Sequence, residues 1–452
     1  METLSETYAD FIVKTHYEQL GYDVVTHTKK LVLDLIGVSL AGYKLMEFPK
    51  ILSNYLQNLG GEPEATIIQA KKKYPAINAA LVNAVCAHSI DMDDGHRFAA
   101  LHPGAVVIPT ALAATELSEA TTKEMITGIV VGYEIMIHLG WAINPSSLNR
   151  GFHTTGIIGP FAAAATAANI MKLNYEETIG ALGLAGLQGA GLLQVNHDEE
   201  GAKVKPISPG RAAQAGLLSC ILSRKGMRGP LRIFEGEDGF LKAVTDEVKT
   251  EILIKNLGKK FEIINTYIKF YAACRHAHAP IDAVLEIMKD SKIDPLEINK
   301  ISVETYPVAI RLAGITHVTT TSAARFSIPF SVALAIIKGD AGADKYTEEN
   351  VRDENIQKLS GKVELNIGGK WEELYPQKRG AKVHIKDNIG REWSAEVELA
   401  KGEPENPASW EEVYNKYYKN SKLLISEEDV KIIGKIIEKL ENYPLDELTV
   451  FL

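Results

Sequence analysis

The stretch HTKKLVLDLIGVSLA at residues 27–41 shows most directly how the first part of the chain folds. Its apolar side chains recur at spacings of three and four residues, which places them on one face of an α-helix. Residues 78–88, NAALVNAVCAH, follow the same spacing, and helical patterns continue to about residue 265. Alternation in steps of two, which is typical of a half-exposed strand, is scarce over this length. We therefore predict an all-helical fold for this part.

Two longer apolar runs lie within this helical region, at residues 126–143 and 156–171. Glu134 and His138 interrupt the first run, and the second is short and rich in alanine. A membrane-spanning helix needs about 20 apolar residues, so both runs are interpreted as buried helices of a large globular bundle. Most glycines between residues 156 and 193 are expected to allow close helix packing, because a glycine costs a helix roughly 1 kcal/mol.

The pattern changes after Tyr267, where segments alternate with the two-residue period of half-exposed strands. These segments are residues 301–306, 362–366, 382–386 and 394–399. Helical patterns lie between them, at residues 280–289 and 327–338, and return at residues 410–452. A chain of 452 residues also favours two domains. We predict a mainly α protein with a large all-helical domain of residues 1–266 and 401–452 and a smaller α+β domain of residues 267–400.

The charge and cysteine content narrow the possible partners and location. The formal net charge of -9 is spread along the chain without a basic block, so nucleic-acid binding is not expected. An anionic substrate would then need a local cluster of Lys, Arg and His. Three widely spaced cysteines, Cys86, Cys220 and Cys274, argue against a disulfide framework, and the acidic N-terminal segment does not resemble a secretory signal. We therefore expect a cytoplasmic protein without a membrane segment.

The segment DMDDGHRFAALHPG at residues 91–104 concentrates groups that can carry chemistry. It holds Asp91 and two further carboxylates, the imidazoles of His96 and His102, and the guanidinium of Arg97. Its glycines and proline favour a loop, where such groups can converge on a ligand. A solvated acidic loop with a helix-capping Asp is an alternative, and Asp and His are also metal ligands. We favour acid–base and positioning roles and expect no metal.

A second cluster, RGFHTTG at residues 150–156, comes directly before an alanine-rich helical pattern. Thr154 or Thr155 is expected to cap that helix, and the free N–H groups of a helix N-terminus can bind an anion. His153 is either a proton-transfer group or a buried core histidine. The segment therefore suits an anion site that includes an imidazole.

Two further clusters contain cations that suit carboxylate binding. In KVKPISPGRAA at residues 203–213, prolines and a glycine restrain the chain between Lys205 and Arg211. The segment KFYAACRHAH at residues 269–278 brings together a Lys, a Tyr, a Cys, an Arg and two His residues. Its Cys274 could act as a nucleophile, but no nucleophile-elbow pattern surrounds it, so we favour a role without a covalent step.

Taken together and in this order, the four clusters resemble the MmgE/PrpD family. The segments IFEGEDGF at residues 233–240 and RFSIP at residues 325–329 add to the resemblance, which spans most of the chain. The resemblance implies an all-helical domain built from both ends of the chain, an α+β lid domain, a homodimer, and no metal or organic cofactor. Members of the family act on small polycarboxylates as dehydratases, decarboxylases or epimerases.

The resemblance also implies which side chains form the site. By motif, the catalytic positions are Asp91, His102, His153, Lys205 and Lys269. The substrate-binding positions expected in the same clusters are His96, Arg97, Thr154, Arg211, Tyr271, Cys274 and Arg275. Cys274 stands where some members have histidine. The loop sequence GHR at residues 95–97 differs from the Thr or Trp that dehydratases and decarboxylases of the family commonly carry, which implies a different arrangement of substrate carboxylates.

From these residues we expect a cofactor-independent lyase of the dehydratase type that acts on a small di- or tricarboxylate. Lysines and arginines would hold the carboxylates while His102 and His153 exchange protons, because imidazole titrates near neutral pH. An epimerase of a similar substrate is the first alternative and a decarboxylase the second. A helical scaffold that binds a polycarboxylate without catalysis is the non-enzymatic alternative, which the retained His and Lys residues disfavour. The site is expected in the cleft between the two domains.

Overall fold

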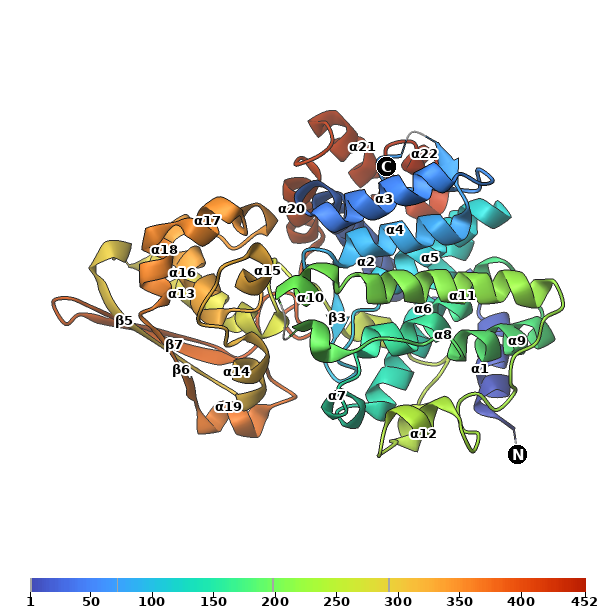
Figure 1. The fold of residues 1–452 in the computed structure, drawn as a ribbon, viewed down its shortest axis with the longest axis horizontal. Helices are drawn as coiled ribbons and strands as arrows, with labels where there is room; N and C mark the ends of the chain where they lie inside the picture. Colours follow the sequence, from blue (N-terminus) through green and yellow to red (C-terminus); the bar gives the residue numbers. More distant parts are fainter. Residues whose placement is uncertain (1, 71, 197–198, 292) are drawn as a thin grey trace.

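The chain forms a large part made almost entirely of helices and a smaller part built on a four-stranded sheet (Figure 1). A computed structural model describes residues 2–70, 72–196, 199–291 and 293–452. The prediction of a mainly α fold with a smaller α+β region is confirmed. The two parts lie side by side along the long axis of the molecule (Figure 1).

The helical part contains helices from both ends of the chain and a few very short strands. Its helices are α1 (Leu4–Lys14), α2 (Tyr22–Leu45), α3 (Glu47–Leu59), α4 (Ala76–His88), α5 (Gly104–Ser118), α6 (Thr122–Ile143), α7 (Ser146–Asn149), α8 (Thr154–Ile170), α9 (Tyr175–Gly186), α10 (Glu199–Val204), α11 (Ile207–Arg224), α12 (Phe240–Val244), α20 (Trp410–Ser421), α21 (Glu427–Glu438) and α22 (Asp446–Thr449). Its strands are β1 (Ala65–Thr66), β2 (Lys73–Tyr74), β3 (Gly95–His96) and β4 (Thr266–Tyr267).

Helix α8 packs against α5, α6 and α11 at the centre of this part. Small residues make the contacts close. A Cβ atom added at Gly159 would lie 2.6 Å from the Cβ of Ala212, and one added at Gly216 would lie 2.4 Å from the Cβ of Ala163. Both distances are too short for non-bonded carbon atoms, so close packing explains the glycine at each of these two positions.

Helix α6 is long and apolar enough to cross a membrane, judged by length and composition. Its most apolar window is, however, 94% buried inside the protein. Met125, Ile129 and Ile137 of this helix belong to the main hydrophobic core. The helix is therefore a buried core element, as the interrupted apolar pattern predicts.

The last helices of the chain join the same core as the first ones. Helix α20 packs against α2, and its Val413 and Tyr417 share one hydrophobic core with residues of α1 and α2. The buried ammonium of Lys416 on α20 lies 2.6 Å from the buried carboxylate of Asp34 on α2. The same ammonium donates a hydrogen bond of 3.0 Å to the carbonyl of Met92, so α20 also supports the loop after α4.

The smaller part has a separate core around a mixed sheet. The sheet has the order β6-β5-β7-β8, in which β5 pairs parallel to β6 and antiparallel to β7, and β7 pairs antiparallel to β8. The strands are β5 (Ile298–Thr305), β6 (Val363–Ile367), β7 (Ala381–Asp387) and β8 (Glu392–Val397). The helices are α13 (His278–Asp290), α14 (Pro307–Ala313), α15 (Thr321–Ala324), α16 (Ile328–Lys338), α17 (Glu348–Arg352), α18 (Glu354–Ser360) and α19 (Gly369–Leu374).

Helices α13 and α16 cover one face of this sheet (Figure 1). Burial alternates along β7, where Ala381, Val383 and Ile385 are buried and the residues between them are more exposed. One face of the sheet thus packs against helices while the other is open, which explains the two-residue period of the sequence.

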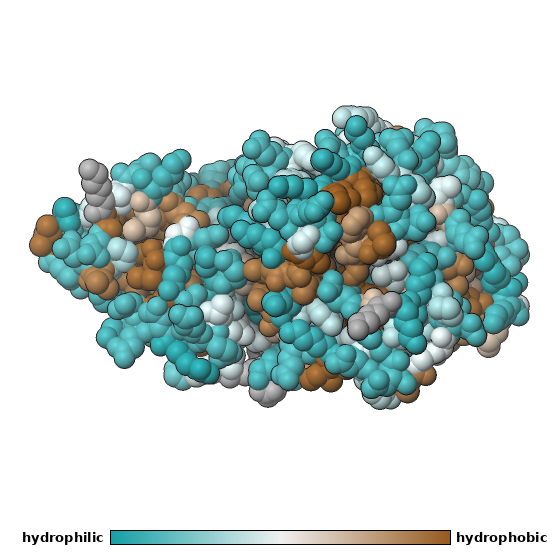
Figure 2. Space-filling model, turned by 90° about the horizontal axis from the view of Figure 1, so that it is seen from above, coloured by the Kyte–Doolittle hydropathy of each residue, from teal (hydrophilic) through white to brown (hydrophobic). Residues whose placement is uncertain are grey.

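Hydrophilic residues cover most of the surface seen from above, and apolar residues gather in several patches (Figure 2). Large apolar side chains exposed on the protein include Tyr22, Tyr55 and Leu187. Scattered residues of this kind are normal on folded proteins. The surface pattern therefore does not by itself identify a binding site.

Candidate active site

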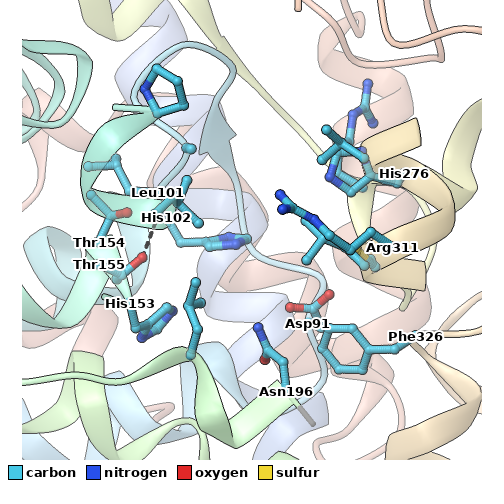
Figure 3. Close-up of a pocket in the computed structure, with 18 of the residues that line it drawn as sticks. Asp91, Leu101, His102, His153, Thr154, Thr155, Asn196, His276, Arg311 and Phe326 are labelled. Atoms are coloured by element: carbon cyan, nitrogen blue, oxygen red, sulfur yellow. Dashed lines mark hydrogen bonds between the residues drawn. The ribbon is translucent and has the colours of Figure 1, made fainter. Parts of the chain in front are cut away.

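A cavity of about 510 Å³ lies between the helical part and the smaller part, and residues from both line it (Figure 3). It brings together these residues of the sequence-based prediction: Asp91, His102, His153, Thr154, Lys205, Lys269, Cys274 and Arg275. It also includes polar residues that the sequence did not indicate as site residues: Asn149, Thr155, Asn196, Tyr267, His276, Arg311, Tyr375 and Arg379.

Asp91 is bound by two lysines from distant parts of the chain. The Nζ of Lys205 lies 3.1 Å from Oδ1, and the Nζ of Lys269 lies 3.1 Å from Oδ2 of the Asp91 carboxylate. Burial opposes ionisation, but the two ammonium groups outweigh it and hold the pKa of Asp91 below its ordinary range. Asp91 also has a left-handed backbone with φ of 52°, which is strained for a residue other than glycine. The strained backbone and both ion pairs keep the carboxylate at the cavity wall.

The short strand pair β3–β4 explains how Lys269 reaches Asp91. Gly95 pairs with Tyr267, so the chain entering the smaller part runs beside the loop that follows α4. A Cβ atom added at Gly95 would lie 2.3 Å from the Tyr267 hydroxyl, so only glycine fits there. Lys269 follows two residues after Tyr267 and donates a hydrogen bond of 2.8 Å to the Asp91 carbonyl.

His102 is held by the loop through its Nδ1 atom. This atom lies 2.8 Å from the carbonyl oxygen of Asp94 and 3.3 Å from Oδ2 of Asp93. The same Oδ2 accepts a hydrogen bond of 2.8 Å from Nδ1 of His88, a fully buried residue at the end of α4. Because Nδ1 of His102 is occupied, its Nε2 is the ring nitrogen left for a ligand, and Figure 3 shows the ring pointing into the cavity.

Burial sets the protonation of this buried group of side chains. It lowers the pKa of His88 to about 4, so the imidazole is neutral at neutral pH and donates its Nδ1 proton to Asp93. Burial would raise the pKa of Asp93, but the contacts with His88 and His102 outweigh it and keep that carboxyl ionised. The ionised Asp93 thus holds both imidazoles through one carboxylate oxygen.

Asp94 supports the loop in the opposite protonation state. Burial, assisted by the neighbouring charge of Asp93, raises the pKa of Asp94 to about 8. Its Oδ1 accepts a hydrogen bond of 3.0 Å from the backbone N–H of Gly104 at the start of α5, and the Tyr133 hydroxyl donates one of 3.0 Å to its Oδ2. A Cβ atom at residue 104 would lie 2.2 Å from Oδ1, which requires glycine there. Asp94 thus binds the N-terminus of α5, as one part of the alternative interpretation proposed, but Asp91, Asp93 and Asp94 are all buried, so a solvated acidic loop is wrong.

His153 lies at the N-terminus of α8, which faces the cavity. It is itself the N-cap residue without a side-chain cap bond, so the prediction that Thr154 or Thr155 caps this helix is wrong. The Thr155 hydroxyl instead accepts a hydrogen bond of 3.1 Å from the backbone N–H of His102 and joins the two segments. Burial and the nearby charge of Lys205 hold the pKa of His153 well below its ordinary range, so its imidazole is neutral. Its Nδ1 is buried and has no hydrogen-bond partner among the described residues.

Four predicted substrate-binding residues lie outside the cavity lining. Arg211 is exposed and contacts Gln214, because α11 turns its Gly210 face toward α4 and directs residue 211 to solvent. His96 packs beside Trp141, with ring centroids 5.9 Å apart. Their expected contact with substrate is not supported by these positions.

Arg97 and Tyr271 are occupied by carboxylates of the protein itself. The guanidinium of Arg97 lies 2.6 Å from Glu405, and the Tyr271 hydroxyl donates a hydrogen bond of 2.5 Å to Asp282 on α13. Arg97 also donates to the carbonyl of Gln377 and so joins the loop to the smaller part, whereas the Tyr271–Asp282 bond lies within the smaller part. Neither residue lines the cavity. Sequence spacing could not show this, because both carboxylates come from other segments of the chain.

His88, Asp93 and His102 are close enough to be considered as a metal site, since one ligand atom of each lies within 4.8 Å of the others. The ligand types also suit a transition metal. These atoms already contact one another, and Nδ1 of His102 also contacts the Asp94 carbonyl. Hydrogen bonds within the group therefore explain why these three side chains lie close together.

Comparison with known proteins identifies the family of the chain. The MmgE/PrpD N-terminal domain model matches residues 6–253, and the MmgE/PrpD C-terminal domain model matches residues 271–442. The chain belongs to the MmgE/PrpD family.

Similar proteins of this family are named as enzymes. The chain is 26% identical to cis-aconitate decarboxylase of Aspergillus terreus over 94% of its own length and 90% of that protein. It is 28% identical to the cis-aconitate decarboxylase-like protein oryM of Aspergillus oryzae, over 59% of the chain and 58% of that protein. It is 22% identical to 2-methylcitrate dehydratase of Escherichia coli O157:H7 over 54% of the chain and 50% of that protein.

Proposed function

We propose that this protein is a cofactor-independent lyase that moves protons at a carbon next to a carboxylate of a small polycarboxylate. The observation that carries the proposal is the meeting of His102, His153 and the Lys205–Asp91–Lys269 group in one cavity. The lysines supply more positive charge than Asp91 neutralises, so this wall attracts an anion despite the net negative charge of the chain.

The two imidazoles suit opposite roles in proton transfer. His153 is neutral because of its lowered pKa, so it can accept a proton from carbon. His102 contacts Asp93 and the Asp94 carbonyl through Nδ1, so its Nε2 faces the cavity and can pass a proton to the substrate. The N-terminus of α8 and the lysines stabilise the negative charge that develops on the substrate during the reaction.

Elimination of water uses one base and one acid and therefore fits this pair best. His153 removes the proton from the carbon next to the carboxylate, and the electron pair of the C–H bond forms a C=C bond. The C–O bond to the neighbouring hydroxyl breaks, and His102 protonates the departing oxygen as water. The reaction class is that of a hydro-lyase.

Decarboxylation is the second candidate, and the similarity to cis-aconitate decarboxylase over most of both chains favours it. In that reaction the C–C bond to a carboxylate breaks, CO2 leaves, and the electron pair stays on carbon. A protonated imidazole then donates its proton to that carbon. The cavity supplies such a donor in His102, so the same residues serve either outcome.

A turnover screen distinguishes these outcomes. The purified full chain is incubated in D2O with citrate, 2-methylcitrate, cis-aconitate and iminodisuccinate, each with and without EDTA. We expect formation of an unsaturated product from a hydroxy acid, unchanged by EDTA. Release of CO2 from cis-aconitate would instead establish the decarboxylase, and inversion with deuterium uptake but no loss of water or CO2 would establish an epimerase. Binding of these acids with no turnover of any would contradict the proposed enzyme.

A further inference from the structure

The lining of the cavity carries more positive charge than the carboxylates of that lining neutralise. Among the described lining residues the cations are Lys205, Lys269, Arg275, Arg311 and Arg379. Asp91 is the one carboxylate in that described lining, and it lies between the two lysines. The three arginines must therefore find their counter-charge elsewhere or remain unpaired.

Glu403 neutralises one of these arginines. Its Oε1 accepts hydrogen bonds of 3.0 Å from Nε and 2.7 Å from Nη2 of Arg275. Burial would raise the pKa of Glu403, but the charges of Arg275, Arg379 and Arg97 outweigh it and keep this carboxyl ionised. Arg97 has a carboxylate of its own in Glu405. Arg275 is thus occupied by the protein and is not free to bind a ligand.

Arg379 retains hydrogen-bonding capacity inside the cavity wall. Its Nη2 donates to the carbonyl of Arg97, which fixes the side chain. The residue is 8% exposed, yet its Nε has no hydrogen-bond partner among the described residues. A buried guanidinium N–H without an acceptor is costly. His276 in the same lining is also buried, and its Nδ1 lies 2.5 Å from the Tyr306 hydroxyl. Its Nε2 is therefore the ring nitrogen that could contact a ligand.

Among the lining cations that the structure describes, Arg311 is the one without a hydrogen bond or ion pair. It lies on α14 and is exposed, and no hydrogen bond or ion pair connects it to any residue that the structure describes. Figure 3 shows its side chain among the cavity residues, on the side of Asp91 and His276. A guanidinium offers a planar pair of N–H donors that matches a carboxylate.

We propose that Arg311, supported by Arg379, forms a second anion subsite, which binds a different substrate carboxylate from the one at the Lys205–Asp91–Lys269 group. This inference rests on the proposed function, because it assumes a polycarboxylate substrate. The two subsites lie on different parts of the chain, so one ligand with at least two carboxylates connects the helical part to the smaller part. Arg311 then selects substrates by the position of their second carboxylate.

Calorimetric titration with tricarballylate, a stable tricarboxylate, tests the subsite on the full chain. We expect Arg311→Leu to weaken tricarballylate binding about 10- to 100-fold, as expected for loss of a charge-assisted contact. Arg311→Lys keeps the charge but loses the paired donors, so its affinity for tricarballylate should lie between those of the wild type and Arg311→Leu. Arg211→Leu is the matched control, because Arg211 is an exposed arginine outside the cavity, and its affinity should equal that of the wild type.

Several results would overturn the subsite while leaving the proposed function intact. One is wild-type affinity in Arg311→Leu, and another is an equal loss in Arg211→Leu, which would indicate long-range attraction without contact. A crystal structure with tricarballylate in which every carboxylate contacts only the lysine side would also reject it. If the wild-type protein bound neither tricarballylate nor citrate, the proposed function would fail, and the subsite would fail with it.

Discussion

The two walls of the cavity differ in whether their charged side chains are paired with other groups of the protein. On the helical side, Asp91 holds both lysines at 3.1 Å, and His102 contacts Asp93 and the Asp94 carbonyl. On the side of the smaller part, Arg311 has no partner among the described residues. A wall that is already bonded is preorganised for chemistry, whereas a wall with free donors gains its bonds from a ligand. We therefore expect the reaction at the first wall and recognition of a further carboxylate at the second.

Removal of His153 is expected to have the largest effect on turnover, and it tests whether the first wall performs the reaction. His153→Gln deletes the proposed base but keeps a polar side chain, so kcat should fall about 10²- to 10⁴-fold. Binding of tricarballylate should change little, because the lysines and Arg311 remain. Steady-state kinetics and calorimetry on the same preparation measure the two effects. Normal turnover in this variant would show that the helical wall does not perform the chemistry assigned to it.

Asp94→Asn tests the protonation that supports the helical wall. The folded-state pKa of about 8 lies above the ordinary value of 3.8, so the stability from the protonated carboxyl is present at low pH and is lost as pH rises from about 4 to about 8. Asn cannot ionise, so the Asp94→Asn variant should not lose this stability as pH rises. We expect the variant to gain on the order of a few kcal/mol relative to the wild type between about pH 4 and about pH 8. Thermal unfolding across this range measures the difference, and parallel curves for both proteins would contradict a neutral Asp94.

Asp93→Asn removes the counter-charge of His102 without removing the imidazole. Turnover should fall on the order of 10- to 100-fold, as for carboxylates that orient metal-bound histidines. The loss should appear in kcat more than in KM, because Asp93 orients the His102 ring and does not line the cavity itself. Equal effects on kcat and KM, or a loss of folded protein in thermal unfolding, would indicate a purely structural role for Asp93.

Cys274→Ser is expected to have the smallest effect. Burial, followed by the charge of Asp91, raises the pKa of this thiol, which keeps it in the unreactive protonated form. The variant should retain kcat within about 10-fold of the wild type, since it keeps the side-chain size and a hydrogen-bonding group. Kinetic assays and mass spectrometry of the protein during turnover check this. A covalent adduct at residue 274, together with inactive Cys274→Ser, would require a thiol mechanism.

The sequence predicted the secondary structure closely where burial is periodic. Residues 78–88 lie in α4, which spans Ala76–His88, and residues 382–386 lie in β7, which spans Ala381–Asp387. These elements bury one face each, so the spacing of their apolar residues follows the geometry of helix or strand. The start of α8 was less predictable, because the Thr155 hydroxyl binds the backbone N–H of His102 in another segment and does not cap its own helix.

The sequence also indicated most of the helical wall of the cavity. Asp91, His102 and His153 lie in short segments with several polar or titratable residues, and such segments can be recognised without a structure. Asp93 was visible as part of the same acidic run, but its role as the shared partner of His88 and His102 was not. That role depends on how the end of α4 meets the following loop.

Tertiary structure alone decided which arginines face the cavity. Arg211 belongs to a recognisable motif yet points to solvent, whereas Arg311 and Arg379 belong to no such motif and line the cavity. The sequence by itself determined which elements form and where most of the candidate reactive groups are concentrated, because local spacing controls both. The direction of a long side chain depends instead on helix register and on partners far away in the chain, such as Glu403 beside Arg275.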